Sequence, residues 1–143
     1  MTSRRFFVDT SALVALISEK DEKRRSAIEI NKLILGLEFK PELVVTNFIV
    51  AEVHAMLLRD TALANDWLVN SAYQDFTVFR PDEEMETRAR SEIKKYDDKD
   101  FSYADMLSFL TMEALGIKYY FAFDTHFAQI GKFKDVAEVL VGP

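Results

Sequence analysis

Short apolar runs alternate with longer helical segments along this chain, and this alternation constrains the fold more than any other feature. The runs are typical of buried strands and cover residues 6–8, 43–45, 76–79, 118–123 and 136–141. The helical segments are indicated by the helical spacing of apolar residues or by capping residues at their start. They cover residues 12–16, 21–37, 48–59, 61–71, 82–96 and 102–115. Strands that alternate with helices form a parallel sheet with both faces covered. We therefore predict an α/β fold in three layers, with a central, mostly parallel five-stranded sheet flanked by helices.

Length and composition narrow the class of protein. The 143 residues suit one domain, and we expect residues 1–143 to form it. The chain has no cysteine, which excludes a disulfide scaffold, a thiolate zinc site and a thiol nucleophile. Its longest apolar run, residues 12–17, is far shorter than the roughly 20 residues of a membrane helix, so we expect a cytoplasmic protein without a membrane span. The formal net charge of −6 argues against duplex binding by basic charge alone.

Four acidic residues occupy positions that a parallel sheet brings to one edge. Asp9 directly follows the first predicted strand, and Asp124 directly follows the fourth. Glu52 and Asp105 lie in the first two turns of helices, and a helix that leaves a parallel strand begins at that same edge. Each residue has a simpler explanation alone, because an aspartate after a strand often caps a helix and Asp105 forms a Ser-x-x-Asp capping pattern with Ser102. The four together favour one site.

Four carboxylates cannot share a site without a counter-charge. Like charges a few ångströms apart destabilise one another, so such a cluster requires protons or a cation. All-oxygen ligands favour hard ions such as Mg²⁺ or Mn²⁺ over zinc or copper. A bound divalent ion lowers the pKa of a water molecule, polarises a phosphoryl oxygen and stabilises a leaving oxygen. The acidic edge therefore suits metal-dependent phosphodiester hydrolysis.

Four stretches of the sequence resemble the successive motifs of PIN-domain ribonucleases. They are FVDTSAL at residues 7–13, VTNFIVAE at 45–52, DFSYAD at 100–105 and FAFDTHF at 121–127. Their order and spacing are similar to those of VapC-type toxins from toxin–antitoxin pairs, and the resemblance extends over residues 6–141. It implies a PIN-like fold and a Mg²⁺- or Mn²⁺-dependent endoribonuclease, a hydrolase that cleaves single-stranded or looped RNA.

The resemblance also assigns roles to the four acids. It implies metal binding and catalysis by Asp9, Glu52, Asp105 and Asp124. As a mechanism, we expect Asp9 and Asp105 to hold the principal ion. Asp124 and Glu52 would complete or orient its ligand shell, and Glu52 would help to remove a proton from the attacking water. No histidine is needed as the base.

Neighbouring residues have supporting roles in this interpretation. By resemblance, Thr10 or Ser11 corresponds to the hydroxyl residue beside the first acid. The approach to the third motif contains Asp98, Asp100 and Ser102, and its acids can help to bind a second ion or lie in a solvated loop. Relatives often carry Thr or Ser two positions before the fourth acid, where this chain has Ala122. Any hydroxyl contact from that position is therefore missing.

The two histidines and the aromatic residues have ordinary structural explanations. His54 lies about 200° around its helix from Glu52, so we expect it to face away. His126 follows the fourth acid closely enough to approach phosphate, but we favour a role in stabilising its loop. Aromatic residues near the fourth strand could stack on bases, although core packing is the more common use, and they are Tyr119, Tyr120, Phe121, Phe123 and Phe127.

Partners are implied mainly by the resemblance. VapC-type relatives form homodimers and bind a separate antitoxin protein, so we expect both partners in addition to the RNA substrate. A group of apolar residues could provide a partner surface or belong to the core: Leu57, Leu58, Leu63, Trp67 and Leu68. Trp67 is the residue of this group that most suggests an interface. Residues 86–95 mix both charge signs, which favours a solvated helix face over a rim that follows phosphates.

Two other functions compete with the ribonuclease. The first is a catalytically silent PIN fold that binds RNA or protein, and the four intact acids argue against it. The second is an aspartyl phosphotransfer domain, which also places an aspartate after the first strand. A haloacid-dehalogenase-like site would require Asp-x-Asp-x-Thr, but the chain has Ser11 in place of the second aspartate. A receiver-like site would require an acidic pair just before Asp9, which is absent.

Overall fold

The computed structural model describes residues 4–142, in which strands and helices alternate. The strands are β1 (Arg5–Val8), β2 (Glu42–Thr46), β3 (Thr77–Phe79), β4 (Tyr119–Phe121) and β5 (Lys134–Asp135). The α-helices are α1 (Thr10–Ile17), α2 (Arg24–Leu35), α3 (Asn47–Met56), α4 (Thr61–Trp67), α5 (Tyr73–Asp75), α6 (Glu83–Glu92), α7 (Tyr103–Leu115), α8 (His126–Ile130) and α9 (Val136–Leu140). A π-helical turn, η1 (Leu68–Ala72), continues α4, and a 3₁₀ turn, η2 (Ile93–Tyr96), continues α6.

The strands form one sheet in the order β3-β2-β1-β4-β5, and every neighbouring pair is parallel. β1 lies in the centre, where Phe7 is opposite Val44 of β2 and Tyr120 of β4. The chain passes from β1 to one side through β2 and β3, and then continues on the other side through β4 and β5. The topological switch point therefore lies between β1 and β4, where ligands bind in folds of this type. The predicted α/β fold is confirmed, with a sheet that is parallel throughout.

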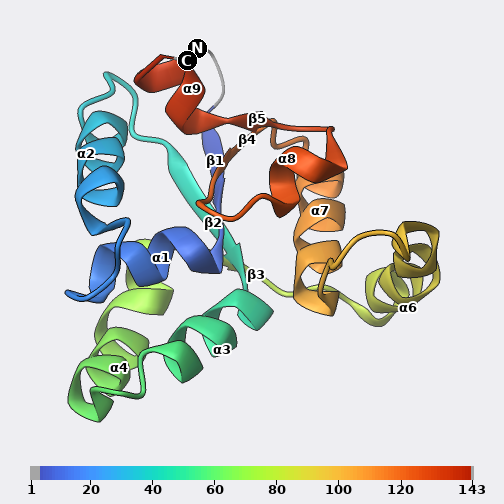
Figure 1. The fold of residues 1–143 in the computed structure, drawn as a ribbon, viewed down its shortest axis with the longest axis horizontal. Coiled ribbons are helices and arrows are strands. Elements are labelled where there is room, and N and C mark those ends of the chain that lie inside the picture. Colours follow the sequence, from blue (N-terminus) through green and yellow to red (C-terminus); the bar gives the residue numbers. More distant parts are fainter. Residues whose placement is uncertain (1–3, 143) are drawn as a thin grey trace.

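Helices cover both faces of the sheet and complete the three layers. α1 and α2 lie on one side of the sheet, and α7 with α6 lies on the other (Figure 1). Fully buried side chains come from every layer and include Leu13 of α1, Phe6 and Phe7 of β1, and Leu107 of α7. Each such Leu or Phe side chain stabilises the fold by about 1.5–3 kcal/mol relative to an exposed one. This packing fixes the central strands whose ends carry the predicted acids.

The predicted strand at residues 136–141 is wrong. The last strand, β5, ends at Asp135, and the residues after it form α9. The Asp135 side chain accepts a hydrogen bond from the backbone N–H of Ala137 (2.9 Å), and this N-cap starts a helix. Val136 is then buried while Val139 is exposed. A short apolar run fits a strand and a buried helical turn equally well, and here the cap decides between them.

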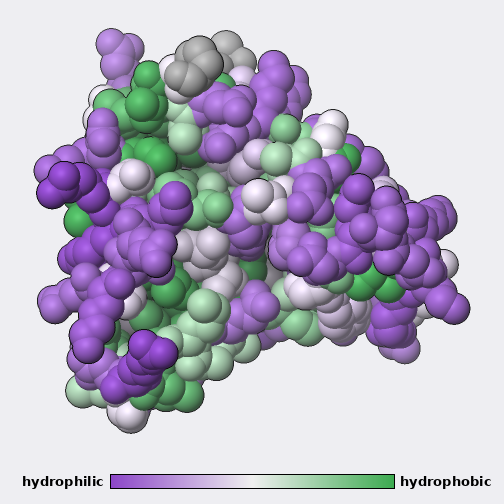
Figure 2. Space-filling model, viewed as in Figure 1, coloured by the Kyte–Doolittle hydropathy of each residue, from purple (hydrophilic) through white to green (hydrophobic). Residues whose placement is uncertain are grey.

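The hydrophobic surface is uneven. Hydrophobic residues gather over α3 and α4, whereas the side of the molecule around α6 is mainly hydrophilic (Figure 2). Large apolar residues are exposed at the end of α3 and in η1 and α5, the segments that follow α4: Met56, Leu58, Val69 and Tyr73. Trp67 and Leu57 are buried, which agrees with the core alternative for this group, whereas Leu58 is exposed. Within residues 4–142, no helix is long and apolar enough to cross a membrane.

Candidate active site

Asp9 lies at the carboxyl edge of the sheet, at the switch point. It follows β1 directly, and its backbone N–H donates to the carbonyl of Phe121 at the end of β4 (3.0 Å). The residue is only 4% exposed. Its Oδ2 accepts hydrogen bonds from the backbone N–H (3.1 Å) and the hydroxyl (2.7 Å) of Ser11. The capping role considered from the sequence is therefore present, and it holds the carboxylate at this edge.

The hydroxyl of Ser11 joins the ends of β1 and β4. It donates to Asp9 and accepts the backbone N–H of Phe123 (2.9 Å) and, with a longer contact, that of Asp124 (3.4 Å). A hydroxyl has one hydrogen to donate and two lone pairs, so these three contacts use all of its capacity. Ser11 thereby positions Asp124 relative to Asp9.

Asp105 reaches the same edge from α7. Its Oδ2 accepts the backbone N–H of Ser102 (3.0 Å), and the Ser102 hydroxyl accepts the backbone N–H of Asp105 (3.0 Å). This reciprocal pair is the capping box expected from the sequence. Asp105 is buried, although it lies in the first turn of its helix. The box therefore fixes a carboxylate that solvent reaches poorly.

Glu52 approaches from α3 and is held by Thr10. The buried Thr10 donates its hydroxyl to Oε1 of Glu52 (2.8 Å). Glu52 is exposed as a whole, but its carboxylate is partly desolvated, and this desolvation raises its pKa. The hydrogen bond from Thr10 opposes that shift, and the charges of Asp9 and Asp105 add to it. Thr10 thus joins the end of β1 to the glutamate.

Asp124 and His126 complete the cluster from the loop between β4 and α8. Oδ1 of Asp124 accepts the backbone N–H of His126 (3.1 Å), which turns the loop back toward the sheet edge. The imidazole Nδ1 lies 2.9 Å from Oδ2 of Asp105 and 3.8 Å from Oδ2 of Asp124. Its Nε2 lies 3.1 Å from Oδ1 of the exposed Asp100. From the sequence, His126 is expected to stabilise its loop, whereas the structure places its ring among the acids.

Burial and mutual repulsion raise the pKa values of the acids. Burial, followed by the charge of Asp124, raises the pKa of Asp9 from 3.8 to about 7. Burial also raises the pKa of Asp105, against the hydrogen bond from Ser102. For His126, burial lowers the pKa, but the charges of Asp105, Asp124 and Asp100 outweigh it and raise the pKa overall. The site therefore stabilises positive charge.

These residues fit a divalent cation. Within residues 4–142, one set of three offers ligand atoms that all lie within 4.8 Å of one another, and it consists of Asp105, Asp124 and His126. Asp9 belongs to the same electrostatic cluster, because it interacts directly with Asp124 and its charge acts on Glu52 and Asp105. Carboxylate oxygens are the preferred ligands of Mg²⁺ and Mn²⁺. A cation would relieve the repulsion that raises the pKa of Asp9.

The remaining candidates take structural positions. His54 lies 2.9 Å from Oδ1 of Asn65 through its Nε2, so it faces α4. Phe127 is fully buried and stacks with the buried Tyr120 at a centroid distance of 4.9 Å, as expected of core residues. Ala122 is buried and offers no hydroxyl.

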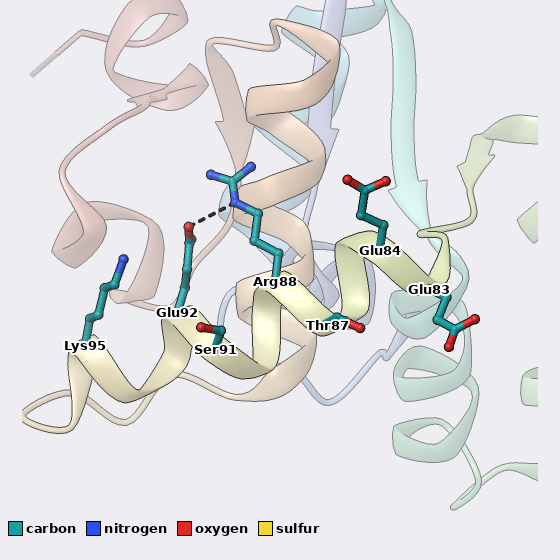
Figure 3. Close-up of a pocket in the computed structure, with 7 residues that line it drawn as sticks. All are labelled: Glu83, Glu84, Thr87, Arg88, Ser91, Glu92 and Lys95. Carbon is teal, nitrogen blue, oxygen red and sulfur yellow. Dashed lines mark hydrogen bonds and ion pairs between the residues drawn. The ribbon is translucent and has the colours of Figure 1, made fainter.

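The charged face of α6 has internal partners for its arginines. Figure 3 shows Arg88 on this face with its guanidinium directed at Glu92, and the two atoms Nε and Oε1 are 2.9 Å apart. Arg88 also lies 3.7 Å from Glu113 of α7, and Arg90 donates to the hydroxyl of Tyr103 (3.1 Å). These contacts favour the solvated helix face expected from the sequence over a rim of free cations.

The family comparison agrees with this fold. The family model of the PIN domain matches residues 6–133, and the chain belongs to the PIN domain family. Among solved structures, the chain is similar to VapC20 of Mycobacterium tuberculosis, a toxin that cleaves the sarcin-ricin loop. The TM-score is 0.78 at 23% identity, and the match covers 89% of this chain and 95% of VapC20. Comparison with curated proteins gives no significant match. The PIN-like fold expected from the motifs is confirmed.

Proposed function

We propose that this protein is a divalent-metal-dependent endoribonuclease of the VapC type that hydrolyses single-stranded or looped RNA. The observation that carries the proposal is the convergence of Asp9, Glu52, Asp105 and Asp124 at one sheet edge, with raised pKa values at three of them. VapC20, which shares the fold, cleaves the sarcin-ricin loop, and this supports a looped RNA as the class of substrate.

The carboxylates of Asp9, Asp105 and Asp124 would hold the cation, Mg²⁺ or Mn²⁺. When bound, such an ion polarises a phosphoryl oxygen and stabilises the negative charge that develops on the leaving oxygen. Ser11 and Ser102 act as positioning residues. The Ser11 hydroxyl donates to Asp9 (2.7 Å), and Ser102 exchanges two hydrogen bonds of 3.0 Å with Asp105. The site is thus arranged before RNA binds, which reduces the cost of reorganisation during the reaction.

Glu52 is the residue that we assign to proton transfer. The hydrogen bond from Thr10 orients its carboxylate, and the raised pKa brings it closer to the range in which a carboxylate can accept protons near neutral pH. A water oxygen forms a bond to phosphorus while one P–O bond to a ribose oxygen breaks. Glu52 takes one proton of the attacking water, and the leaving ribose oxygen takes a proton from bulk water. Glu52 then returns its proton to the solvent, so the protons balance.

The test is cleavage of defined single-stranded and hairpin RNAs with Mg²⁺, Mn²⁺ or EDTA. We expect cleavage with either metal, none in EDTA, and a loss of about 100-fold or more for Asp9→Asn. Asp75→Asn, at an exposed aspartate of α5, is the matched control and should retain activity. Cleavage that persists in EDTA and in Asp9→Asn would reject the metal mechanism.

Two outcomes of this assay would support the competing functions. A folded wild-type protein that binds RNA and leaves it intact with every metal would be a catalytically silent PIN module. Acid-labile phosphorylation of Asp9 would support the aspartyl phosphotransfer domain instead. Both outcomes would overturn the ribonuclease.

We further propose that the protein acts as a toxin in the cytoplasm, forms a homodimer and binds a cognate antitoxin. The exposed apolar residues Met56, Leu58, Val69 and Tyr73 support a protein partner in the region of α3 and η1. Expression of the protein alone should arrest growth, and Asp105→Asn should relieve the arrest. Analytical ultracentrifugation of the purified protein measures its oligomeric state.

Growth that continues although the cells contain full-length, active protein would reject the proposed role as a toxin.

A further inference from the structure

His126 places a shielded ring nitrogen inside the acid cluster. Its Nδ1 is excluded from solvent and has no hydrogen-bond partner among the described residues. The atom lies 2.9 Å from Oδ2 of Asp105, but the contact lacks the direction of an N–H···O hydrogen bond. A proton on Nδ1 would therefore have no acceptor in line with it. Buried polar atoms without a partner are rare in folded proteins, so this nitrogen requires an explanation.

The other ring nitrogen of His126 is engaged outside the cluster. Nε2 lies 3.1 Å from Oδ1 of Asp100, and an ionised carboxylate can only accept, so Nε2 carries the ring proton. In the neutral ring, Nδ1 then has a lone pair beside the carboxylate oxygens of Asp105 and Asp124. These electron-rich atoms repel one another unless a proton or a metal cation lies among them, and a proton on Nδ1 would lack an acceptor in line with it. A carboxylate that holds the second N–H of the ring is the usual arrangement around a metal-binding histidine.

We propose that His126 is a metal ligand through Nδ1, next to carboxylate ligands from Asp105 and Asp124, and that Asp100 is a positioning residue for the ring. The proposal rests on the metal-dependent function proposed above. It adds a nitrogen ligand to a site for which the sequence indicated carboxylates alone. The three ligand atoms already lie within 4.8 Å of one another.

The surroundings of His126 hold the ring in this position. Phe101 is buried and meets the imidazole edge to face, with ring centroids 5.7 Å apart. The backbone N–H of His126 donates to Oδ1 of Asp124 (3.1 Å), which couples the ring to a neighbouring ligand. Because the His126 ring is already held in place, it loses little conformational entropy when a cation binds. Its nitrogen can therefore contribute to the affinity for the cation.

A nitrogen ligand changes which cation the site prefers. Mg²⁺ is a hard ion that takes oxygen ligands almost exclusively, whereas imidazole suits the divalent transition metals. The site should therefore bind Mn²⁺ more tightly than Mg²⁺. The ratio of the two affinities should exceed that of a site with carboxylate ligands alone. Removal of the imidazole should weaken Mn²⁺ binding by about 10-fold or more while changing Mg²⁺ binding less.

The experiment exploits the fact that the chain has only two histidines. Full-length protein is loaded with Mn²⁺, and electron spin-echo spectroscopy detects ¹⁴N coordinated to the ion. We expect ¹⁴N modulation in the wild type and in His54→Gln, the matched control, and its loss in His126→Gln. Wild-type protein labelled with ¹⁵N-histidine should show the ¹⁵N signal instead, and this arm does not depend on folding of a variant. Calorimetric titration with Mn²⁺ and with Mg²⁺ gives the two affinities for each protein.

Each outcome separates this inference from the proposed function. Bound Mn²⁺ without nitrogen modulation in the wild type would overturn the inference while leaving the metal-dependent nuclease intact. An Mn²⁺-to-Mg²⁺ affinity ratio that is the same in wild type and folded His126→Gln would also overturn it. If the wild type binds neither ion and also leaves RNA intact, the proposed function itself fails.

Discussion

At Asp9, burial and the charge of Asp124 together hold a proton on a carboxyl group that would lose it in water. Its pKa is raised from 3.8 to about 7, so between these values the folded state binds a proton that the unfolded state has released. The contribution of Asp9 to stability is therefore greatest below pH 4 and decreases as the pH rises to about 7. The loss is up to about 4 kcal/mol, since one pKa unit corresponds to about 1.4 kcal/mol. Denaturant unfolding of metal-free protein from pH 4 to pH 8 measures it.

Comparison with Asp9→Asn isolates this effect from the titration of other groups. Asparagine keeps a polar cap for α1 but has no charge. The free energy of unfolding of wild type minus that of Asp9→Asn should decrease with rising pH in EDTA. Saturating Mn²⁺ should stabilise the wild type more at pH 8 than at pH 5, because the ion replaces the proton. A difference that stays flat across this range in EDTA would contradict the raised pKa.

Ser11 tests the connection between β1 and β4. Ser11→Ala removes the hydroxyl that accepts the backbone N–H of Phe123 and donates to Asp9. We expect a loss of about 1–3 kcal/mol in the free energy of unfolding, because a partly buried N–H is left without an acceptor. RNA cleavage should decrease further than stability alone explains, because Asp124 loses its fixed position. Ser91→Ala on the exposed face of α6 is the control and should change stability by less than about 0.5 kcal/mol.

Among the elements, α7 depends on its capping box. Ser102→Ala removes the acceptor of the Asp105 backbone N–H, which typically costs about 1 kcal/mol. Asp105 then loses a constraint on its carboxylate, so we expect weaker Mn²⁺ binding as well. Ser102→Thr keeps the hydroxyl and should restore both properties. Thermal unfolding with and without Mn²⁺ measures both effects, and an unchanged metal-dependent shift in Tm for Ser102→Ala would contradict the positioning role.

The sequence predicted the order of strands and helices, but it did not predict all the caps and loops at their ends. The strand–helix alternation and the motifs predicted the fold and the edge that carries Asp9 and Asp124, because topology alone brings strand ends together. The run at residues 136–141 failed as a strand, since its period does not distinguish strand from helix and the cap at Asp135 decides. His126 was not placed among the acids, because that position depends on how the loop after β4 folds back. Caps and loop conformations depend on hydrogen bonds between particular atoms, and the spacing of apolar residues along the sequence does not reveal these bonds.

For the molecule as a whole, four of the 24 acidic residues belong to one site, against a net charge of −6. Neutralising Asp9, Glu52, Asp105 and Asp124 would change it to −6 + 4 = −2. The arginines of α6 that could have contacted phosphates are paired with protein groups instead, Arg88 with Glu92 and Arg90 with Tyr103. With a net charge of −6, this chain would attract RNA only weakly at long range, so the proposed function requires the cation and local contacts to hold much of the phosphate charge.

This distribution of charge predicts how binding of RNA depends on metal and on salt. An RNA analogue that the protein does not cleave should bind wild-type protein more tightly with Mn²⁺ than with EDTA, because the cation would contact the phosphate. With Mn²⁺ present, the decrease in affinity from 50 to 200 mM salt should be small, because the cation would hold the phosphates in place of lysine and arginine side chains. Fluorescence anisotropy measures both quantities. The comparison is the double variant Asp105→Asn/Asp124→Asn, which lacks two of the negative charges of the site. That variant should bind RNA equally with Mn²⁺ and EDTA. A steep salt dependence together with full binding in EDTA would mean that a basic surface, and not the metal, holds the phosphates.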